Sequence, residues 1–380
     1  MKFTKIDKAL LETVELLDNT KKWNCIVKAN DYARLKKILV HNKIEILDEY
    51  LFIKSFFVNI TKIQMEALSN MSQVKYISSV SSASMMINVS KEILGIKDTF
   101  LSGKGQTVAL IDTGISLHPD FCLQEKRVVL FKDFIGEKEN PYDDNGHGTF
   151  VAGVCAGNGA MSGGKYNGIA PQSKIISLKA LNKKGEASAD RILSAMEWVY
   201  DNHKKYDIKV VCMSFGSDPL GYNDPIMMGA ETLWREGITV VAAAGNSGPE
   251  YQTIKSPGVS SQIITVGGFD DNRFENGKFN ENFFELAKFS SRGPAFQRYK
   301  PDLVAPGVDI ISCGIKENYT KLSGTSVATP MIAGLALLLL EQNPKLKPNE
   351  IKRKLLSCCK PITFNKNFEG YGYPILNRII

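Results

Sequence analysis

Residues 324–330 read Gly-Thr-Ser-Val-Ala-Thr-Pro and lead directly into the apolar run from Met331 to Leu340. Small residues around Ser326, followed by a strongly helix-forming segment, place this serine at a helix start, where the helix dipole favours developing negative charge. Two interpretations follow. Either Thr325 or Ser326 is the N-cap of a buried helix, or Ser326 is a nucleophile. The other motifs of the chain decide between them.

A serine nucleophile needs a general base within hydrogen-bond reach and a third group that orients the base. The chain has four histidines. His147 lies in Asp-Asn-Gly-His-Gly-Thr (144–149), where the flanking glycines leave the imidazole uncrowded. His118 lies in a turn signal, His-Pro-Asp, whereas His41 and His203 lie in charged surroundings typical of a solvated surface. We therefore predict that His147 is the base.

The orienting acid is indicated by an apolar run, Thr107 to Ile111, that ends in Asp112-Thr113-Gly114. Such a run is typical of a buried parallel strand, and catalytic groups belong at the carboxyl ends of these strands. Asp-Thr-Gly also occurs in aspartic proteases, which need two such carboxylates to share one proton. The chain has no second Asp-Thr-Gly or Asp-Ser-Gly, which argues against an aspartic protease.

A further apolar run, Val240 to Ala244, ends in Gly245 and Asn246. One interpretation of Asn246 is an ordinary turn asparagine. An asparagine at this place can instead donate its amide to the oxyanion of a tetrahedral intermediate, together with the N–H of the nucleophile. Four complementary residues at strand ends and helix starts favour the catalytic interpretation.

These motifs closely resemble those of the subtilisin-like serine proteases. The order Asp112, His147, Ser326 matches the acid, base and nucleophile order of that family. The similarity spans residues from about 102 to about 356. Val327 stands where the family more often has methionine, a change that removes no catalytic atom.

The resemblance implies a serine endopeptidase that forms an acyl-enzyme and is made as a self-inhibited zymogen. In it, Ser326 attacks the peptide carbonyl, and Asn246 with the Ser326 N–H holds the oxyanion. A second hypothesis is a pseudoprotease that stays locked by its own pro-domain and binds peptides or a partner protease. A fluorophosphonate probe separates the two.

Substrate-binding residues are also implied by the resemblance, and the expected partners are extended peptides or proteins. They are Ser214, Phe215 and Gly216 for one wall of the S1 pocket, Ala243, Ala244 and Gly245 for the opposite wall, and Gly185, Glu186 and Ala187 for an edge segment that pairs with the substrate.

The resemblance also places Lys255 near the pocket floor. Its ammonium favours acidic P1 residues if it points inward, and a solvated loop lysine is the commoner alternative. Ser256-Pro257 is a candidate cis bond.

The chain from 92 to 380 is expected to be the catalytic domain. Apolar runs alternate with helical patterns, which predicts a doubly wound α/β fold with a mostly parallel sheet and helices on both faces. We expect strands over 108–111, 174–178, 210–214, 239–243 and 263–266, and helices over 148–157, 188–203 and 225–236.

Ahead of the catalytic domain, residues 1–20 are expected to form an amphipathic helical extension, on the spacing of Ile6, Leu10, Val14 and Leu17. Residues 21–82 show a βαββαβ order typical of a ferredoxin-like α+β fold. We expect strands over 23–27, 44–47, 51–60 and 74–80, and helices over 32–40 and 62–69. Beside a subtilisin-like domain, this segment resembles the family's pro-domain, a chaperone and inhibitor that lies in the active-site cleft.

Residues 83–91 are small and polar enough to be a linker, with a probable processing site.

The apolar run 331–340 is shorter than the ~20 residues of a membrane span and predicts a core helix, with no membrane partner. A net charge of +7 without a long basic block does not predict nucleic-acid binding.

The seven cysteines are scattered and odd in number, which suits free thiols in a reducing compartment. The charged N-terminal stretch has no secretory pattern. We therefore expect a cytoplasmic protein similar to the leaderless intracellular subtilisin-like peptidases of bacteria, with export by a non-Sec route as the alternative.

No cofactor is expected to be required. Many subtilisin-like proteases bind calcium, and Asp120 matches one of their ligands. The loop 157–167 has no carboxylate, however, and six or more oxygen ligands for a hard cation cannot be read from it. A structural calcium ion is therefore allowed by the resemblance, but no metal site can be assigned.

Overall fold

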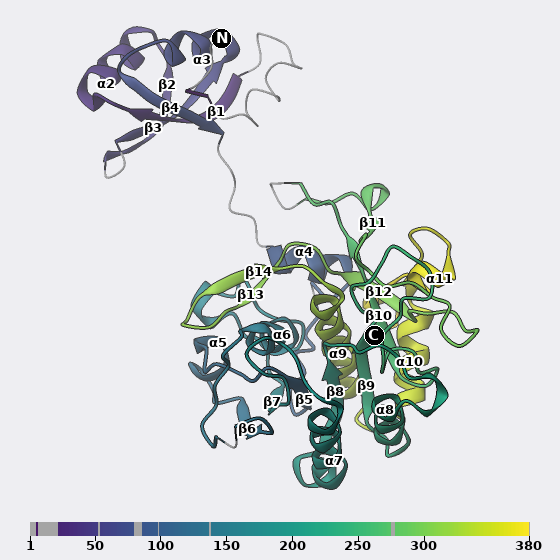
Figure 1. Cartoon of the computed structure of the whole chain (residues 1–380). Coiled ribbons are helices and arrows are strands. Elements are labelled where there is room, and N and C mark those ends of the chain that lie inside the picture. The colour runs from purple at the N-terminus through teal and green to yellow at the C-terminus, as the bar shows by residue number, and fades with distance from the viewer. Residues whose placement is uncertain are drawn as a thin grey trace. The chain divides into compact units, whose positions relative to one another are not determined.

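The computed structural model describes residues 5–6, 22–51, 54–79, 86–97, 99–136, 138–274 and 278–379 of the 380. The chain forms two compact units, Met1–Ala83 and Ser84–Ile380, called unit 1 and unit 2 below (Figure 1).

Unit 1 contains an antiparallel sheet of four strands in the order β2-β3-β1-β4, packed with two helices. The elements in chain order are β1 (Lys22–Ala29), α2 (Tyr32–His41), β2 (Glu45–Tyr50), β3 (Ser55–Thr61), α3 (Lys62–Ser69) and β4 (Val74–Ser79). Both helices begin at capping side chains. Asp31 accepts the N–H of Arg34, and Thr61 forms a capping box with Gln64. The βαββαβ order predicted from the sequence is confirmed.

Two expectations for unit 1 need correction. The strand expected over 51–60 begins only at Ser55, because β2 continues to Tyr50 and the chain turns through Lys54 at a positive φ of 50°. Ile6, expected on a helix, forms a parallel β-bridge with Ile77 of β4 and is 5% exposed. Burial in the core of unit 1 therefore accounts for its apolar character. The rest of the expected helical extension lies outside the described residues.

The linker expected over 83–91 is also wrong over most of its length. Residues 83–85 lie outside the described residues, and helix α4 (Met86–Ile93) begins directly after them. The helix belongs to unit 2, where Ser90 and Ile93 are buried and Ile93 packs beside Phe269 and Tyr373. Burial of its last turn against unit 2 explains why this polar-looking segment is ordered as a helix.

Unit 2 is built on a mostly parallel sheet with the order β11-β10-β9-β8-β5-β7-β6, in which β12 also pairs with β10. Its strands are β5 (Thr107–Asp112), β6 (Val128–Asp133), β7 (Lys174–Lys179), β8 (Ile208–Met213), β9 (Thr239–Ala243), β10 (Ile264–Asp270), β11 (Glu285–Leu286) and β12 (Leu303–Pro306). The sheet has the predicted α/β fold. Two small hairpins lie outside it: β13 (Ile310–Cys313) with β14 (Tyr319–Leu322), and β15 (Cys359–Lys360) with β16 (Tyr373–Pro374).

Helices cover both faces of this sheet (Figure 1). The pair α6 (His147–Ala156) and α9 (Thr325–Gln342) packs on one face, and the pair α7 (Ala189–Tyr206) and α8 (Pro225–Arg235) packs on the other. Peripheral helices are α5 (Pro119–Cys122), α10 (Pro348–Ser357) and α11 (Lys366–Glu369), and the short 3₁₀ turns are η2 (Ala160–Ser162), η3 (Gly221–Asn223), η4 (Glu281–Phe283) and η5 (Leu376–Arg378).

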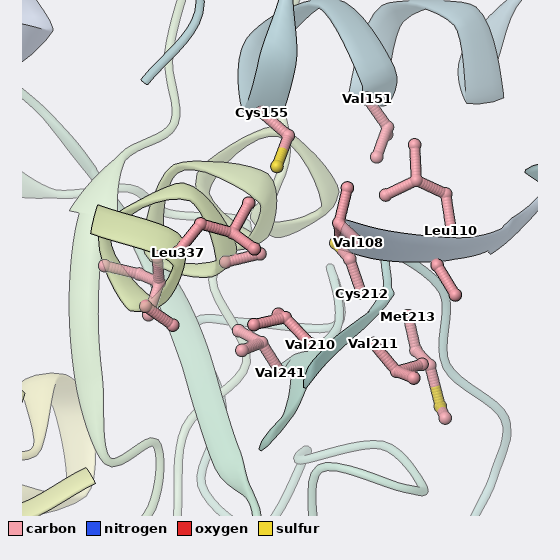
Figure 2. Packing of buried hydrophobic residues seen from close by; sticks show 14 of the residues in the cluster. Val108, Leu110, Val151, Cys155, Val210, Val211, Cys212, Met213, Val241 and Leu337 are labelled. Atoms are coloured by element: carbon pink, nitrogen blue, oxygen red, sulfur yellow. The ribbon is translucent and has the colours of Figure 1, made fainter. Parts of the chain in front are cut away.

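The core of unit 2 packs on both faces of the sheet, against α6 and α9 on one face and against α7 and α8 on the other. Figure 2 shows Val151 and Cys155 of α6 beside Val108 and Leu110 of β5, with Leu337 of α9 nearby. Helix α9 is long and apolar enough to cross a membrane by length and composition alone, yet 83% of it is buried inside unit 2. It is the core helix that the apolar run 331–340 predicts.

Candidate active site

The order of the central strands brings the predicted site residues to one edge of the sheet. β8 lies between β5 and β9, and all three strands are parallel. Asp112 is the last residue of β5, Ser214 follows the end of β8, and Asn246 follows the end of β9. Parallel strands present their carboxyl ends at the same edge, where α/β proteins place their ligands. Segments more than a hundred residues apart in sequence therefore meet there.

Asp112 and His147 are joined by a hydrogen bond. Nδ1 of His147, the first residue of α6, donates to Oδ1 of Asp112 over 2.8 Å. Because a carboxylate only accepts, Nδ1 carries the ring proton and Nε2 keeps its lone pair. Asp112 also accepts the N–H of Thr113 at 2.7 Å, which holds the carboxylate at the strand end. The histidine side chain is 24% exposed, so Nε2 stays accessible while Asp112 is buried.

The two chain segments approach so closely because both carry glycine. A β-carbon on Gly148 would lie 2.2 Å from the carbonyl oxygen of Gly114, and one on Gly114 would lie 2.1 Å from the carbonyl oxygen of Tyr142. No side chain fits at either distance. The sequence predicts that the glycines beside His147 leave its ring uncrowded. The structure shows a different role for Gly148, which permits backbone contact between the start of α6 and the end of β5.

Asp143 is a partly buried residue of this site that the sequence reasoning missed. Its Oδ1 accepts Thr113 Oγ1 at 2.9 Å and Gly146 N at 2.8 Å, and its Oδ2 accepts the N–H and hydroxyl of Thr149. Thr113 Oγ1 in turn accepts Gly148 N at 2.8 Å. The carboxylate therefore fixes the turn before His147. An aspartate just ahead of a helix start is a capping signal that would have marked it.

The pKa of His147 reflects four influences. Burial, the largest, lowers this pKa, whereas the charge of Asp112, the hydrogen bond to Asp112 and the charge of Asp143 together raise it by more. The net result is a His147 pKa above its usual value. Several N–H and hydroxyl donors lower the pKa of Asp143 against the effect of burial, so it stays ionised.

The capping interpretation of Ser326 is wrong. The N-cap of α9 is Gly324, which has no side chain to cap the helix, and Thr325 and Ser326 are the first two helical residues. The Ser326 hydroxyl is therefore not used as a cap. It lies in the first turn of α9 and is partly exposed, at the end of the helix where the dipole stabilises negative charge.

Gly324 keeps a small space open between Ser326 and Asn246. A β-carbon at Gly324 would lie 3.1 Å from Ser326 Oγ, 3.3 Å from Asn246 Nδ2 and 3.7 Å from Ser326 N. One hydroxyl and two N–H donors therefore border the same empty point. This arrangement suits an oxyanion beside an attacked carbonyl carbon.

Thr325 decides which end of the Asn246 amide faces that space. The Thr325 N–H donates to Asn246 Oδ1 at 2.9 Å, and the Thr325 hydroxyl donates to the same oxygen at 3.0 Å. Two donors require the carbonyl oxygen at that position, which leaves the NH₂ group directed at the space beside Gly324. The hydroxyl of Thr325 also accepts Gly245 N at 3.2 Å. Sequence reasoning treated Thr325 only as a possible cap.

Comparison with known proteins agrees with this geometry. The Subtilase family (peptidase S8) profile matches residues 103–373, which is most of the chain.

The chain belongs to the subtilase family of serine proteases.

Among its relatives, serine protease AprX of Bacillus subtilis (strain 168) is 43% identical over 277 residues, which are 67% of this chain and 61% of AprX. Subtilisin DY of Bacillus licheniformis is 34% identical over 67% of this chain and 84% of its own length. The fold is similar to that of the solved S41 psychrophilic protease, with a TM-score of 0.66, 29% identity and coverage of 77% of this chain and 99% of that chain.

The expected walls of the subtilase substrate pocket lie at the ends of β8 and β9. Ser214 is buried and Gly216 is exposed on one side. On the other side the backbone is occupied: Ala244 N donates to Val266 O, Ala244 O accepts Lys255 N, and Gly245 O accepts Ser291 N. These backbone groups of the second wall are already hydrogen-bonded within the protein, so the wall can contact a substrate side chain but not bind it through them. The expected cis bond at Ser256-Pro257 is confirmed.

The expected edge segment is a tight turn on the surface. Both backbone groups of Glu186 are used inside it, because its N–H donates to Asn182 Oδ1 and its carbonyl accepts Asn182 N. The N–H of Gly185 is used in the same turn, because it donates to Asn182 O at 2.9 Å. The expected pairing with a substrate strand would therefore use the carbonyl of Gly185 and the backbone of Ala187. Asn145, two residues before His147, donates to Lys183 O at 3.0 Å and ties this turn to the base.

Asp120 does not fit a calcium ion. Its carboxylate, fully buried, accepts the hydroxyl of Tyr319 at 2.8 and 3.0 Å, the N–H of Met161 at 3.0 Å and the thiol of Cys313 at 3.5 Å. Burial and Asp120 raise the pKa of both Tyr319 and Cys313, so these donors keep their protons. Calcium needs several oxygen ligands, and here the carboxylate is surrounded by donors.

A buried arginine takes up the neighbouring carbonyl groups. The guanidinium of Arg127 donates to the carbonyl oxygens of Asp120, Ala156 and Ser173. Three oxygens that would be available to a cation are therefore bound to a charged side chain of the protein itself.

Proposed function

We propose that this subtilase is a serine endopeptidase made as a self-inhibited zymogen, with Asp112, His147 and Ser326 as its triad and Asn246 as an oxyanion donor. The observation that carries the catalytic part is the shared space beside Gly324. It is bordered by a hydroxyl and by two N–H donors, while the Asp112–His147 hydrogen bond leaves Nε2 free as a base.

The chemistry follows from these groups. Nε2 of His147 removes the proton of Ser326 as Oγ attacks the peptide carbonyl carbon, and Asp112 stabilises the imidazolium that forms. The negative oxygen of the tetrahedral intermediate is held by Asn246 Nδ2 and Ser326 N. His147 then protonates the leaving amine. Water repeats the cycle to release the acyl group.

The inhibitory role is assigned to unit 1. It is a small α+β unit placed ahead of the catalytic unit, with its own buried core. M-protease of Shouchella clausii (strain KSM-K16) is 29% identical over 354 residues, which are 91% of this chain. Unit 2 alone is too short to supply that coverage, so the similarity reaches into unit 1.

Processing can be tested by comparing the wild-type chain with Ser326→Ala. We expect intact mass and N-terminal sequencing to show the wild type shortened near residues 80–91, where Ser79 ends β4 and α4 begins at Met86. Ser326→Ala should keep its full length. Identical, full-length N-termini in both proteins would contradict self-processing.

A fluorophosphonate probe tests catalytic competence separately. Such probes react with an activated serine, so labelling of the wild type at Ser326 and not of Ser326→Ala is expected. Labelling of unprocessed chain would show that unit 1 does not block the site. No labelling in either state would support the alternative, a locked pseudoprotease.

A further inference from the structure

Lys255 occupies the space between the two walls described above. A β-carbon on Gly216 would lie 2.6 Å from Cβ of Lys255, and one on Gly245 would lie 2.4 Å from Cγ of Lys255. The aliphatic stem of the lysine therefore fills the volume that two glycines leave open. A residue that touches both walls leaves less room between them.

The backbone holds Lys255 firmly in this place. Its N–H donates to Ala244 O at 2.9 Å, and the next residue, Ser256, exchanges two hydrogen bonds with Ser217 at 2.8 and 3.0 Å. Lys255 is thus attached to one wall directly and to the other through its neighbour. The commoner alternative for this position is a solvated loop lysine, whereas the Lys255 side chain is 25% exposed and its stem lies against Gly216 and Gly245.

The charged end of Lys255 has one ionic partner, and that partner is exposed. Nζ donates to Asp218, whose side chain is 85% exposed, whereas the lysine side chain is 25% exposed. An ion pair with so exposed a carboxylate contributes little free energy, because water and salt compete for both groups. Another carboxylate can therefore replace Asp218 without a large loss.

The reacting centre lies next to this lysine. Gly245, which touches the stem, directly precedes Asn246, whose amide faces the space beside Gly324. If the proposed function is right, the attacked carbonyl oxygen occupies that space. The side chain of the residue that supplies this carbonyl, P1, then enters between the walls and meets Lys255.

We propose that Lys255 makes this enzyme selective for a carboxylate side chain at P1, with Asp218 as an internal counter-ion that the substrate displaces. The inference rests on the proposed function. The filled slot disfavours large aromatic side chains, since the lysine stem occupies their volume. A P1 carboxylate forms a charge-assisted hydrogen bond with Nζ, which is worth roughly tenfold or more in selectivity.

The test uses peptides that are identical except at P1, with Glu compared against its uncharged isostere Gln, and with Phe as the large side chain. We expect a kcat/KM ratio of Glu over Gln of about ten or more. Lys255→Met keeps the stem and removes the charge, so the ratio should fall to about one. Asp218→Asn removes the competitor, so the ratio should rise.

A matched control is the Lys209–Asp207 ion pair at the other end of β8. Lys209→Met changes the net charge equally and should leave the ratio unaltered. A wild-type ratio near one, or an unchanged ratio in Lys255→Met, would overturn the proposal.

Counting active sites with a fluorophosphonate in each preparation separates this failure from a failure of the proposed function. A labelled enzyme without a Glu preference refutes only the role of Lys255.

Discussion

The hydroxyl of Thr113 donates to the partly buried carboxylate of Asp143 over 2.9 Å. Thr113 follows the predicted acid, and Asp143 holds the turn that carries the predicted base. The position of His147 relative to Asp112 is therefore set by side chains that take no part in proton transfer.

Thr113→Val should separate these roles, because it keeps the shape and removes the hydroxyl. Asp143 loses a donor and Gly148 N loses its acceptor, which we expect to destabilise the fold by about 1–3 kcal/mol. Misplacement of His147 should lower kcat by up to ~10²-fold. Thr113→Ser is the control and should restore most of both. A Thr113→Val enzyme with normal kcat and stability would show that the link is dispensable.

Gly324→Ala tests the shared space without removing any functional group. The added methyl would lie within 3.3 Å of Ser326 Oγ and Asn246 Nδ2 and would exclude the oxyanion. We expect a loss of kcat of roughly 10²–10³-fold, as for the removal of one oxyanion donor. Thermal unfolding and the far-ultraviolet circular dichroism spectrum should change little. If activity survives, the oxyanion lies elsewhere.

Asn246 and Thr325 should act as one unit. Asn246→Ala is expected to lower kcat by roughly 10²–10³-fold, with a smaller change in KM. Thr325→Val removes the hydroxyl that holds Asn246 Oδ1, so it should lower kcat through the same donor. In the double variant the two losses should be less than additive. Additive losses would mean that Thr325 does not act by orienting Asn246.

The pH dependence follows from the pKa of His147. Asp112 and Asp143 raise that pKa, and only the neutral ring accepts the Ser326 proton. The acid limb of kcat/KM should therefore have its midpoint above about 6.5, the usual value for histidine. Asp143→Asn removes one raising charge and should move the midpoint to lower pH. A midpoint below 6.5 in the wild type would contradict the electrostatic description.

The same shift affects stability with a defined sign. A raised pKa means that protonated His147 is favoured in the folded state, so this contribution is complete below the unfolded pKa. It is lost as the pH rises through the folded pKa. Stability measured across this window should thus fall slightly, while activity rises.

Calcium should not stabilise the protein through Asp120. We expect calcium and a chelator to give the same difference in melting temperature for the wild type and for Asp120→Asn, because donors already surround this carboxylate. Tyr319→Phe removes one donor and should lower stability by about 1–3 kcal/mol. A calcium-dependent rise in melting temperature that disappears in Asp120→Asn would contradict this prediction.

The sequence predicted those features that depend on neighbouring residues along the chain. β9 matches its expected range, and β5, β7 and β8 differ by a few residues, because continuous apolar runs mark buried strands. Asp112, His147 and Asn246 are predicted as site residues because each stands at or just after the end of a strand, or at the start of a helix.

Other features depend on contacts between distant segments and left little local signal. Ile6 has the spacing of a helix residue, but a partner in β4 decides its conformation. The role of Thr325 requires knowing that Asn246 lies beside it, 79 residues away in sequence. Lys255 could be placed near the pocket only through a family resemblance, and its contacts with both walls appear only in three dimensions.

The position of helix α9 has a consequence for synthesis. The proposed acid and base lie at residues 112 and 147, whereas the proposed nucleophile is carried by a helix that is packed against β8, β9, β10 and β12. A ribosome extends a chain at about 5–20 residues per second and releases the early parts first. The nascent chain therefore lacks both its proposed nucleophile and its central helix until α9 has been synthesised. The order of these segments delays proteolytic activity until the catalytic unit can fold.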